Sequence, residues 1–222
     1  TGPGNIYVTA AKKLVYGEVD IDMLAGPSEI FIVAEGLEYA AYIAADMLSQ
    51  AEHDPNSASI LATPDPQLAE AVKEELALQL EDLPRAAICR TSLENNGLII
   101  ITDTIDEAVE AANEYAPEHL ELIVENPMAL IGQIKAAGSV FVGPYTPEPV
   151  GDYYGGTNHI LPTGGTAVYA SPLSVSDFVK STSLISYSRD RLLASVRDIE
   201  ILAQIEGLGA HANAVRIRRE RG

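Results

Sequence analysis

The sequence predicts an α/β protein in which a mostly parallel sheet is flanked by helices and followed by a small helical segment at the carboxyl end. Short apolar runs of strand length alternate with longer segments of helical spacing from about residue 29 to residue 143. Hydrophobic residues make up 47% of the 222 residues. That content is enough to bury a full core in one large or two small domains.

The first elements are expected before residue 53. Residues 7–16 have helical spacing and end before Gly17, a residue type that commonly ends helices. Residues 19–23 have the pattern of a short strand. Residues 29–34 form an apolar run typical of a strand buried on both faces, so we expect this strand to be central. An alanine-rich helix should follow over residues 38–52.

The alternation continues through the middle of the chain. We expect strands over residues 59–63, 97–102, 120–125 and 139–143, and helices over residues 66–80, 105–115 and 127–136. Such alternation favours parallel strands joined by helical crossovers.

The composition changes after Gly143. Residues 144–173 are rich in Gly, Pro, Tyr and Thr and have no clear periodicity. A stretch of this length in a compact domain is usually functional or disordered, and its aromatic and apolar content argues against disorder. Helices are expected over residues 175–184 and 189–205. The basic segment over residues 215–222 either pairs with the acidic remainder or is a solvated end.

Charge and cysteine content restrict the class of protein. Lys and Arg total 14 against 32 Asp and Glu, a formal charge of −18, which would repel a nucleic acid backbone. No apolar run approaches the length of a membrane span. The single cysteine, Cys89, fits a reducing compartment and a buried hydrophobic role, so we expect a cytoplasmic protein. The opening in a glycine-proline turn without Met indicates a fragment of a longer chain.

The four histidines all lie near possible partner groups. These clusters are Gln50 with His53, Glu118 with His119, Asp152 with Asn158 and His159, and Glu206 with His211. Imidazoles, carboxylates and a neutral oxygen ligand are what a metal-assisted proton-transfer site requires. We therefore expect function to reside in these clusters.

Each cluster also has a simpler interpretation. Gln50 and His53 project from one side of a helix, as two metal ligands would. The same residues are also expected at a solvent-exposed helix end that binds no metal. Glu118 and His119 could divide two proton transfers, or be a capping acid and a surface imidazole; they precede a strand, whereas open α/β sheets usually bind ligands at the carboxyl ends of strands. His159 contacts a ligand or braces its loop.

Glycine positions bear on the last histidine cluster and on nucleotide binding. Glu206 and His211 flank Gly207-Leu208-Gly209, and the simpler interpretation of this cluster is a free turn without a ligand. Neither GxGxxG nor the P-loop pattern occurs, so the sequence contains no dinucleotide fingerprint. The main docking surface for any nucleotide would lie elsewhere.

Seven segments span essentially the whole chain: GPGNIYVTAAK (residues 2–12), DMLAGPSE (22–29), MLSQAEHDP (47–55), APEHLEL (116–122), AGSVFVG (137–143), GDYYGGTNHILPT (151–163) and EGLGAHANAV (206–215). Together and in this order, they resemble histidinol dehydrogenase.

The resemblance implies an NAD-dependent zinc enzyme that oxidises L-histidinol through the aldehyde to L-histidine, the end of histidine biosynthesis. The residues that it implies as zinc ligands are Gln50, His53, Asp152 and His211. Glu118 and His119 would be the acid–base pair, with His119 as base on the alcohol and Glu118 activating water.

It also implies further contacts. Ser28 and Glu206 would contact the substrate, together with Gln50, His53, His119, Asp152 and His211, and Asn5 would contact the cofactor. The site would be shared in a homodimer, with His211 acting in trans.

Chains of this family are about twice as long as this one. We therefore expect an incomplete Rossmann-like sheet that exposes edges and apolar faces, with little or no turnover unless the rest is supplied. The expected parts are a remnant of the preceding, cofactor-side domain (residues 1–27), a Rossmann-like domain with the catalytic loop (28–170) and a helical dimerisation segment (171–222). The alternatives are a zinc hydrolase in which Glu118 activates water, and a catalytically silent interaction module.

Overall fold

The computed structural model describes every residue except Pro3 and Gly222, so one residue of the opening turn and the last residue of the basic segment lie outside the described residues. The chain divides into two compact units, Thr1–Val179 and Lys180–Gly222. Each unit is described by itself below. Among the described residues, no helix combines the length and apolar character that crossing a bilayer requires.

The first unit is built on one parallel sheet, with strand order β3-β2-β1-β4-β5. The strands are β1 (Glu29–Ala34), β2 (Ala58–Thr63), β3 (Gly97–Ile101), β4 (His119–Ile123) and β5 (Ser139–Val142). All four ladders are parallel. The expected fold class is confirmed. Strand β1 is central in this order, as predicted, and all six of its residues are buried.

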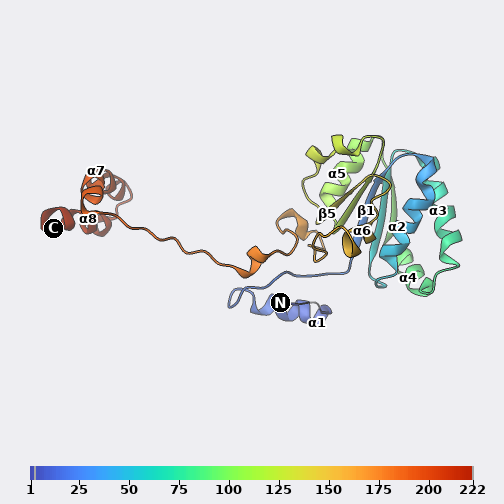
Figure 1. Ribbon diagram of the computed structural model, residues 1–222, viewed down its shortest axis with the longest axis horizontal. Coiled ribbons are helices and arrows are strands. Elements are labelled where there is room, and N and C mark those ends of the chain that lie inside the picture. Colours follow the sequence, from blue (N-terminus) through green and yellow to red (C-terminus); the bar gives the residue numbers. More distant parts are fainter. Residues whose placement is uncertain (3, 222) are drawn as a thin grey trace. The chain divides into compact units, whose positions relative to one another are not determined.

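Helices cover both faces of this sheet (Figure 1). One face carries α2 (Ala40–Ala51) and α3 (Pro66–Leu80), and the other carries α5 (Ile105–Tyr115). The bounds of α3 and α5 agree with prediction because the sequence marks their starts: the side chains of Asp65 and Thr104 accept backbone N–H groups of the first turn. A 3₁₀ turn at Leu37–Tyr39 leads into α2.

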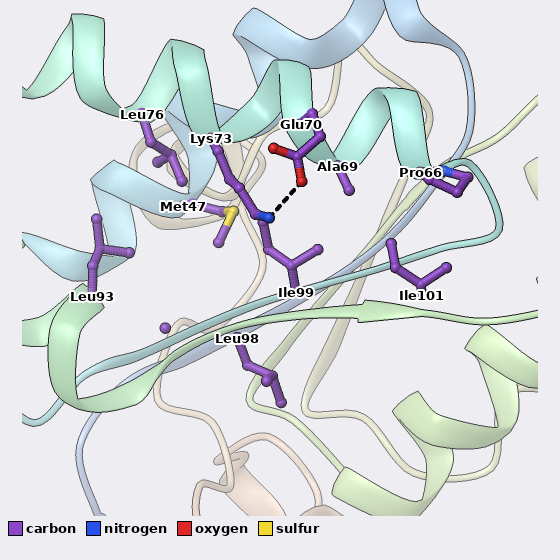
Figure 2. Close-up of a pocket in the computed structure, with 11 residues that line it drawn as sticks. Met47, Pro66, Ala69, Glu70, Lys73, Leu76, Leu93, Leu98, Ile99 and Ile101 are labelled. Atoms are coloured by element: carbon purple, nitrogen blue, oxygen red, sulfur yellow. Dashed lines mark hydrogen bonds and ion pairs between the residues drawn. The ribbon is translucent and has the colours of Figure 1, made fainter.

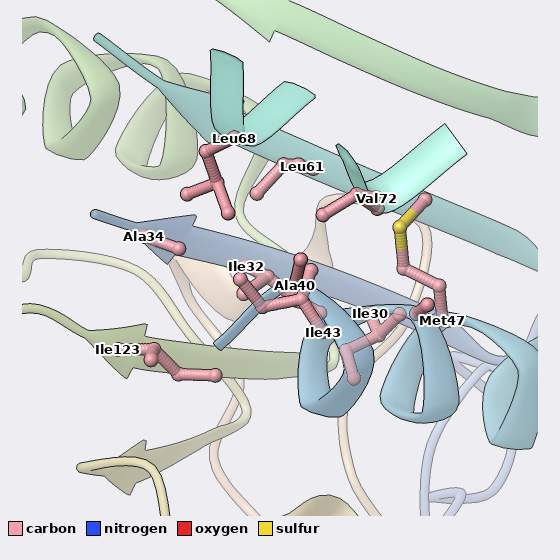
Figure 3. Close-up of a cluster of buried hydrophobic side chains, with 11 residues drawn as sticks. Ile30, Ile32, Ala34, Ala40, Ile43, Met47, Leu61, Leu68, Val72 and Ile123 are labelled. Atoms are coloured by element: carbon pink, nitrogen blue, oxygen red, sulfur yellow. The ribbon is translucent and has the colours of Figure 1, made fainter. Parts of the chain in front are cut away.

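One core cluster lies between β1 and the helices α2 and α3 (Figure 3). Ile30 and Ile32 of β1 point to this side and are fully buried, together with Ile43 of α2 and Leu68 of α3. Alternate residues of the same strand, Phe31 among them, face the α5 side. Period-two alternation in a strand with two covered faces explains why the whole run is apolar.

An apolar hollow lies beside β3, at one edge of the sheet (Figure 2). Its volume is about 410 Å³, and Met47, Leu93 and Ile99 are among its lining residues. Leu98 and Ile101 of β3 each remain 50% exposed. This edge therefore has the unpaired, partly apolar character expected of an incomplete sheet.

Helix α4 (Ala86–Asn96) was not predicted from the sequence. Its buried residues are only Cys89 and Ser92, so its apolar periodicity is weak. The Ser92 hydroxyl donates to the Ser57 carbonyl at 2.9 Å. Burial of the free Cys89 thiol agrees with the hydrophobic role expected for it.

Two predicted elements near the sheet are wrong. Residues 19–23 form no strand: Val19 makes only an isolated bridge with Tyr16, and the Asp22 side chain accepts the Gly2 N–H and pairs with Lys12. Residues 127–136 form two 3₁₀ turns, Pro127–Ala129 and Ile131–Gln133, rather than one helix. There the Asn113 side chain accepts the Lys135 N–H at 2.6 Å, which holds the chain out of helical geometry.

The region after β5 is partly ordered into short elements. Helix α6 (Glu148–Tyr153) and a 3₁₀ turn at Thr166–Val168 lie within the stretch that had no periodicity. The predicted helix over residues 175–184 is wrong: only Val175–Phe178 forms a 3₁₀ turn, closed by a Ser174–Asp177 capping box. Residues 179–187 are exposed, so no packed face supports a helix there.

The remaining helices lie at the two ends of the chain. Helix α1 (Ile6–Val15) begins at Asn5, whose side chain accepts the N–H groups of Tyr7 and Val8. The second unit is a pair of packed helices, α7 (Arg189–Ile205) and α8 (Gly209–Arg221). An Arg219–Glu200 ion pair at 3.1 Å joins these two helices, so a residue of the basic segment pairs with an acid of its own unit.

Candidate functional site

Helix α2 brings Gln50 to the amino ends of β1 and β4. A helix that follows a parallel strand runs back antiparallel to it, so the carboxyl end of α2 lies where the strands begin. Gln50 is 1% exposed, and its Oε1 lies 2.9 Å from Nδ1 of His119. His53, which follows the last turn of α2, is exposed. The structure therefore places Gln50, but not His53, inside the buried cluster.

Strand β4 supplies the acid and the imidazole. Glu118 lies just before this strand and His119 is its first residue, so both are at the amino end, as predicted. Glu118 Oε2 accepts the Glu29 N–H at 3.0 Å and lies 3.8 Å from Nδ1 of His119. Both side chains are buried, at 7% and 5% exposure. The surface histidine considered from the local sequence is therefore excluded.

The hydrogen bonds of His119 determine its tautomer. Its Nδ1 lies 3.0 Å from the Glu29 carbonyl oxygen, which can only accept a hydrogen bond. Nδ1 must therefore carry the proton, and Nε2 keeps its lone pair. Phe141 packs edge-on against the ring, with 5.9 Å between centroids, and limits its rotation. The ring is thus held with an unprotonated nitrogen available to a ligand or a proton.

Helix α6 adds two carboxylates to the same cluster. One ligand atom each from His119, Glu148 and Asp152 lies within 4.8 Å of the other two. A Cβ added at Gly151 would come within 2.8 Å of the Phe141 ring, so glycine allows α6 to approach β5 this closely. Sequence reasoning identified Asp152 and missed Glu148, although Glu148 precedes it by one helical turn.

Burial shifts the pKa values of this cluster in opposite directions. Removal from water raises the pKa of Glu118 to about 7 and lowers that of His119 to about 4. The pKa of Glu148 is raised to about 8, first by burial and then by the neighbouring Asp152 carboxylate. Near neutral pH, His119 is therefore a neutral imidazole beside an acid that can both hold and release a proton.

The loop after α6 returns to the start of β1. The Gly164 N–H donates to Glu29 Oε1 at 3.1 Å, and the Gly26 N–H donates to the Thr163 hydroxyl at 2.6 Å. His159 of this loop is exposed. These bonds fix the segments that surround Glu29, whose backbone contacts both Glu118 and His119.

A cavity of about 520 Å³ adjoins the start of β1 and is lined in part by Asn5, Ser28 and His53. The resemblance implies that Asn5 contacts the cofactor, Ser28 the substrate and His53 the metal. All three residues line this one cavity. Nothing in their separation along the sequence predicted this. The roles themselves stay predictions.

Glu206 and His211 belong to the second unit. Both are exposed; Glu206 follows the last residue of α7, and His211 lies in the first turn of α8. The free turn considered for His211 is therefore not observed, since helix α8 contains it. The participation of Glu206 and His211 in the site stays a prediction.

The geometry defines an α/β protein with a buried acid–imidazole pair beside carboxylate and amide oxygens, a class suited to proton transfer and to a divalent cation. A model of the family described as Histidinol dehydrogenase matches residues 1–219. The histidinol dehydrogenase of Heliobacterium mobile is 56% identical over 221 residues, which is 100% of this chain and 52% of that relative. The Halalkalibacterium halodurans relative of the same name is 54% identical over 220 residues, 99% of this chain.

A solved structure agrees with these relatives. The crystal structure of histidinol dehydrogenase from Elizabethkingia anophelis superposes with a TM-score of 0.92 at 40% identity, covering 99% of this chain and 51% of that one. The chain belongs to the histidinol dehydrogenase family. It spans about half the length of the relatives it matches.

Proposed function

We propose that the complete protein is a histidinol dehydrogenase, an oxidoreductase that converts L-histidinol through L-histidinal to L-histidine with NAD⁺ and zinc, at the end of histidine biosynthesis in the cytoplasm. Family membership supports this proposal. The observation that carries it furthest is the buried, neutral His119 with a free Nε2 beside Glu118, a carboxyl group of pKa about 7. The chain alone is expected to show little or no turnover, because it covers half of its relatives.

The residues of the site fit a zinc ion. The carboxylate oxygens of Glu148 and Asp152 converge beside His119, and Oε2 of Glu29 is buried without a hydrogen-bond partner among the described residues, so the site offers oxygen atoms that a divalent cation would satisfy. We assign Gln50, His53, Asp152 and His211 as the zinc ligands. When bound, zinc orients the imidazole and amine of the substrate, and NAD⁺ takes up the hydride.

The residues of this chain carry the proton transfers. In the first oxidation, Nε2 of His119 accepts the hydroxyl proton of the alcohol while the carbon-bound hydrogen leaves as hydride, and a C=O bond forms. In the second, the Glu118 carboxylate accepts a proton from the water that adds to the aldehyde carbon. His119 then accepts the proton of the resulting hydroxyl as the second hydride leaves. A low pKa keeps His119 unprotonated before each step.

Substrate and cofactor contacts follow the same assignment. Ser28 and Glu206, with the zinc-binding residues and His119, contact L-histidinol, and Asn5 contacts NAD⁺. The cavity lined by Asn5, Ser28 and His53 supports this arrangement. We further propose a homodimer in which His211 reaches the site of the partner. In this proposal residues 1–27 belong to the cofactor-side domain, residues 28–170 form the Rossmann-like domain, and residues 171–222 form the dimerisation segment.

The test uses the chain joined to the amino-terminal half that its relatives possess. We expect histidinol-dependent NADH formation and stoichiometric zinc. His119→Asn should lower kcat by about 10²-fold or more while zinc content stays the same. His53→Ala should lower zinc content instead. Absence of NADH formation together with hydrolysis of histidinol ester analogues would refute the proposal in favour of a zinc hydrolase.

A further inference from the structure

Three elements each contribute two polar side chains, one to each of two stacked layers. Gln50 of α2, His119 of β4 and Asp152 of α6 form the upper layer, at the site already described. Asp46, Glu121 and Glu148 form the lower layer, which meets the upper layer at Glu148, because a ligand atom of Glu148 lies within 4.8 Å of ligand atoms of His119 and Asp152. The spacing is four residues in the two helices and two in the strand, so the periods of helix and strand place both members of each pair on one face.

The lower layer is a buried set of carboxyl groups. Asp46, Glu121 and Glu148 are 9%, 1% and 3% exposed. Glu121 is opposite Ile32 in the register of β4 with β1, so it points toward α2 from the same face as His119. Nearly complete burial of an acid in the middle of a strand is costly and requires a structural reason.

Glu121 connects the elements on either side of it. Its Oε1 accepts the Glu148 N–H at 2.9 Å, which holds the first residue of α6. Burial, followed by the charge of Asp46 on α2, raises the pKa of Glu121. Its Oε2 has no hydrogen-bond partner among the residues that the structure describes. The side chain thus lies between the two helices that carry Gln50 and Asp152.

We propose that Glu121 is a positioning residue that fixes α6 against β4 and α2, and so sets the separation of the Gln50 and Asp152 oxygen atoms for a divalent ion. Helix α6 is only six residues long, and a helix this short depends on tertiary contacts for its position. Groups behind metal ligands typically determine ligand orientation and contribute strongly to affinity. The inference rests on the proposed zinc site.

The experiment compares substitutions of one residue in the chain joined to its amino-terminal half. Glu121→Gln keeps an oxygen that accepts the Glu148 N–H, whereas Glu121→Met has similar volume and cannot accept it. The zinc Kd is measured by competition with a chromophoric chelator. The visible absorption of the Co²⁺-substituted protein reports ligand geometry separately from activity. Melting by circular dichroism reports stability.

We expect Glu121→Met to weaken zinc binding by about tenfold or more and to alter the Co²⁺ spectrum. Its melting temperature should not fall, because an apolar side chain replaces a buried acid. Glu121→Gln should bind zinc within about threefold of the parent. A parent-like zinc Kd in Glu121→Met, or equal losses in the two variants, would overturn the inference.

Glu121→Asp provides a second comparison if Glu121→Met does not fold. It keeps the charge but withdraws the acceptor from the Glu148 N–H by one methylene group, so zinc binding should again weaken. Zinc binding unchanged from the parent would overturn the inference. A parent that binds no zinc would refute the proposed function as well, whereas a zinc-binding parent with unaffected variants would refute the positioning role alone.

Discussion

The metal-free chain should lose stability as the pH rises through neutrality, and Glu118 should account for a measurable part of this loss. Glu118 is 7% exposed, and burial raises its pKa from 4.5 to about 7. Because the folded state binds this proton more tightly than the unfolded state does, the contribution to stability is fully present below the unfolded pKa. It is lost as the pH rises through the folded pKa.

The magnitude follows from the size of the shift. At about 1.4 kcal/mol for each pKa unit, the raised pKa of Glu118 corresponds to roughly 3 kcal/mol between the two extremes of pH. Glu29, Asp46 and Glu148 also have raised pKa values and add to this decrease. The lowered pKa of His119 opposes it, because the unfolded state binds that proton more tightly below about pH 6.5, but four acids act against one imidazole. Stability should therefore be higher near about pH 5 than near about pH 9.

The matched variant is Glu118→Gln, which keeps an oxygen for the Glu29 N–H but does not titrate. The free energy of unfolding is measured with urea and a chelator from about pH 5 to about pH 9. Because the chain has no Trp, unfolding is followed by far-ultraviolet circular dichroism. The variant should lose about 2–3 kcal/mol less than the parent over this range. Equal pH dependence in the two proteins would refute the reasoning.

Three further predictions concern the first unit. Ile32→Ala should lower the free energy of unfolding by about 2–5 kcal/mol in urea titrations, because Ile32 is fully buried in the core cluster, and a cost below about 1 kcal/mol would contradict that packing. Thr104→Ala should cost about 1 kcal/mol by the same measurement, since its hydroxyl accepts the Glu107 N–H at the start of α5, and Thr104→Ser should restore most of it. The buried Cys89 thiol should react with a thiol reagent only as the chain unfolds; fast labelling of the native protein would show that α4 does not cover it.

Elements with strong local signals could be predicted from the sequence. The apolar run of β1 and the capped starts of α3 and α5 gave bounds that the structure confirms. The wrong helix over residues 127–136 and the missed α4 share one cause: their local apolar pattern is weaker than the tertiary contacts that shape them. A hydrogen bond to the Asn113 side chain shapes residues 127–136, and burial of Cys89 and Ser92 stabilises α4.

The sequence by itself determined the fold class, the family and the candidate residues, because apolar periodicity and segment order are local properties of the chain. Only the tertiary structure decided which of those residues meet. It brought Gln50 and Asp152 to His119, left His53 exposed, and added Glu148 and Glu121. The physical reason is that burial and hydrogen bonds between distant segments, rather than residue type, fix the tautomer of His119 and the raised pKa of Glu118.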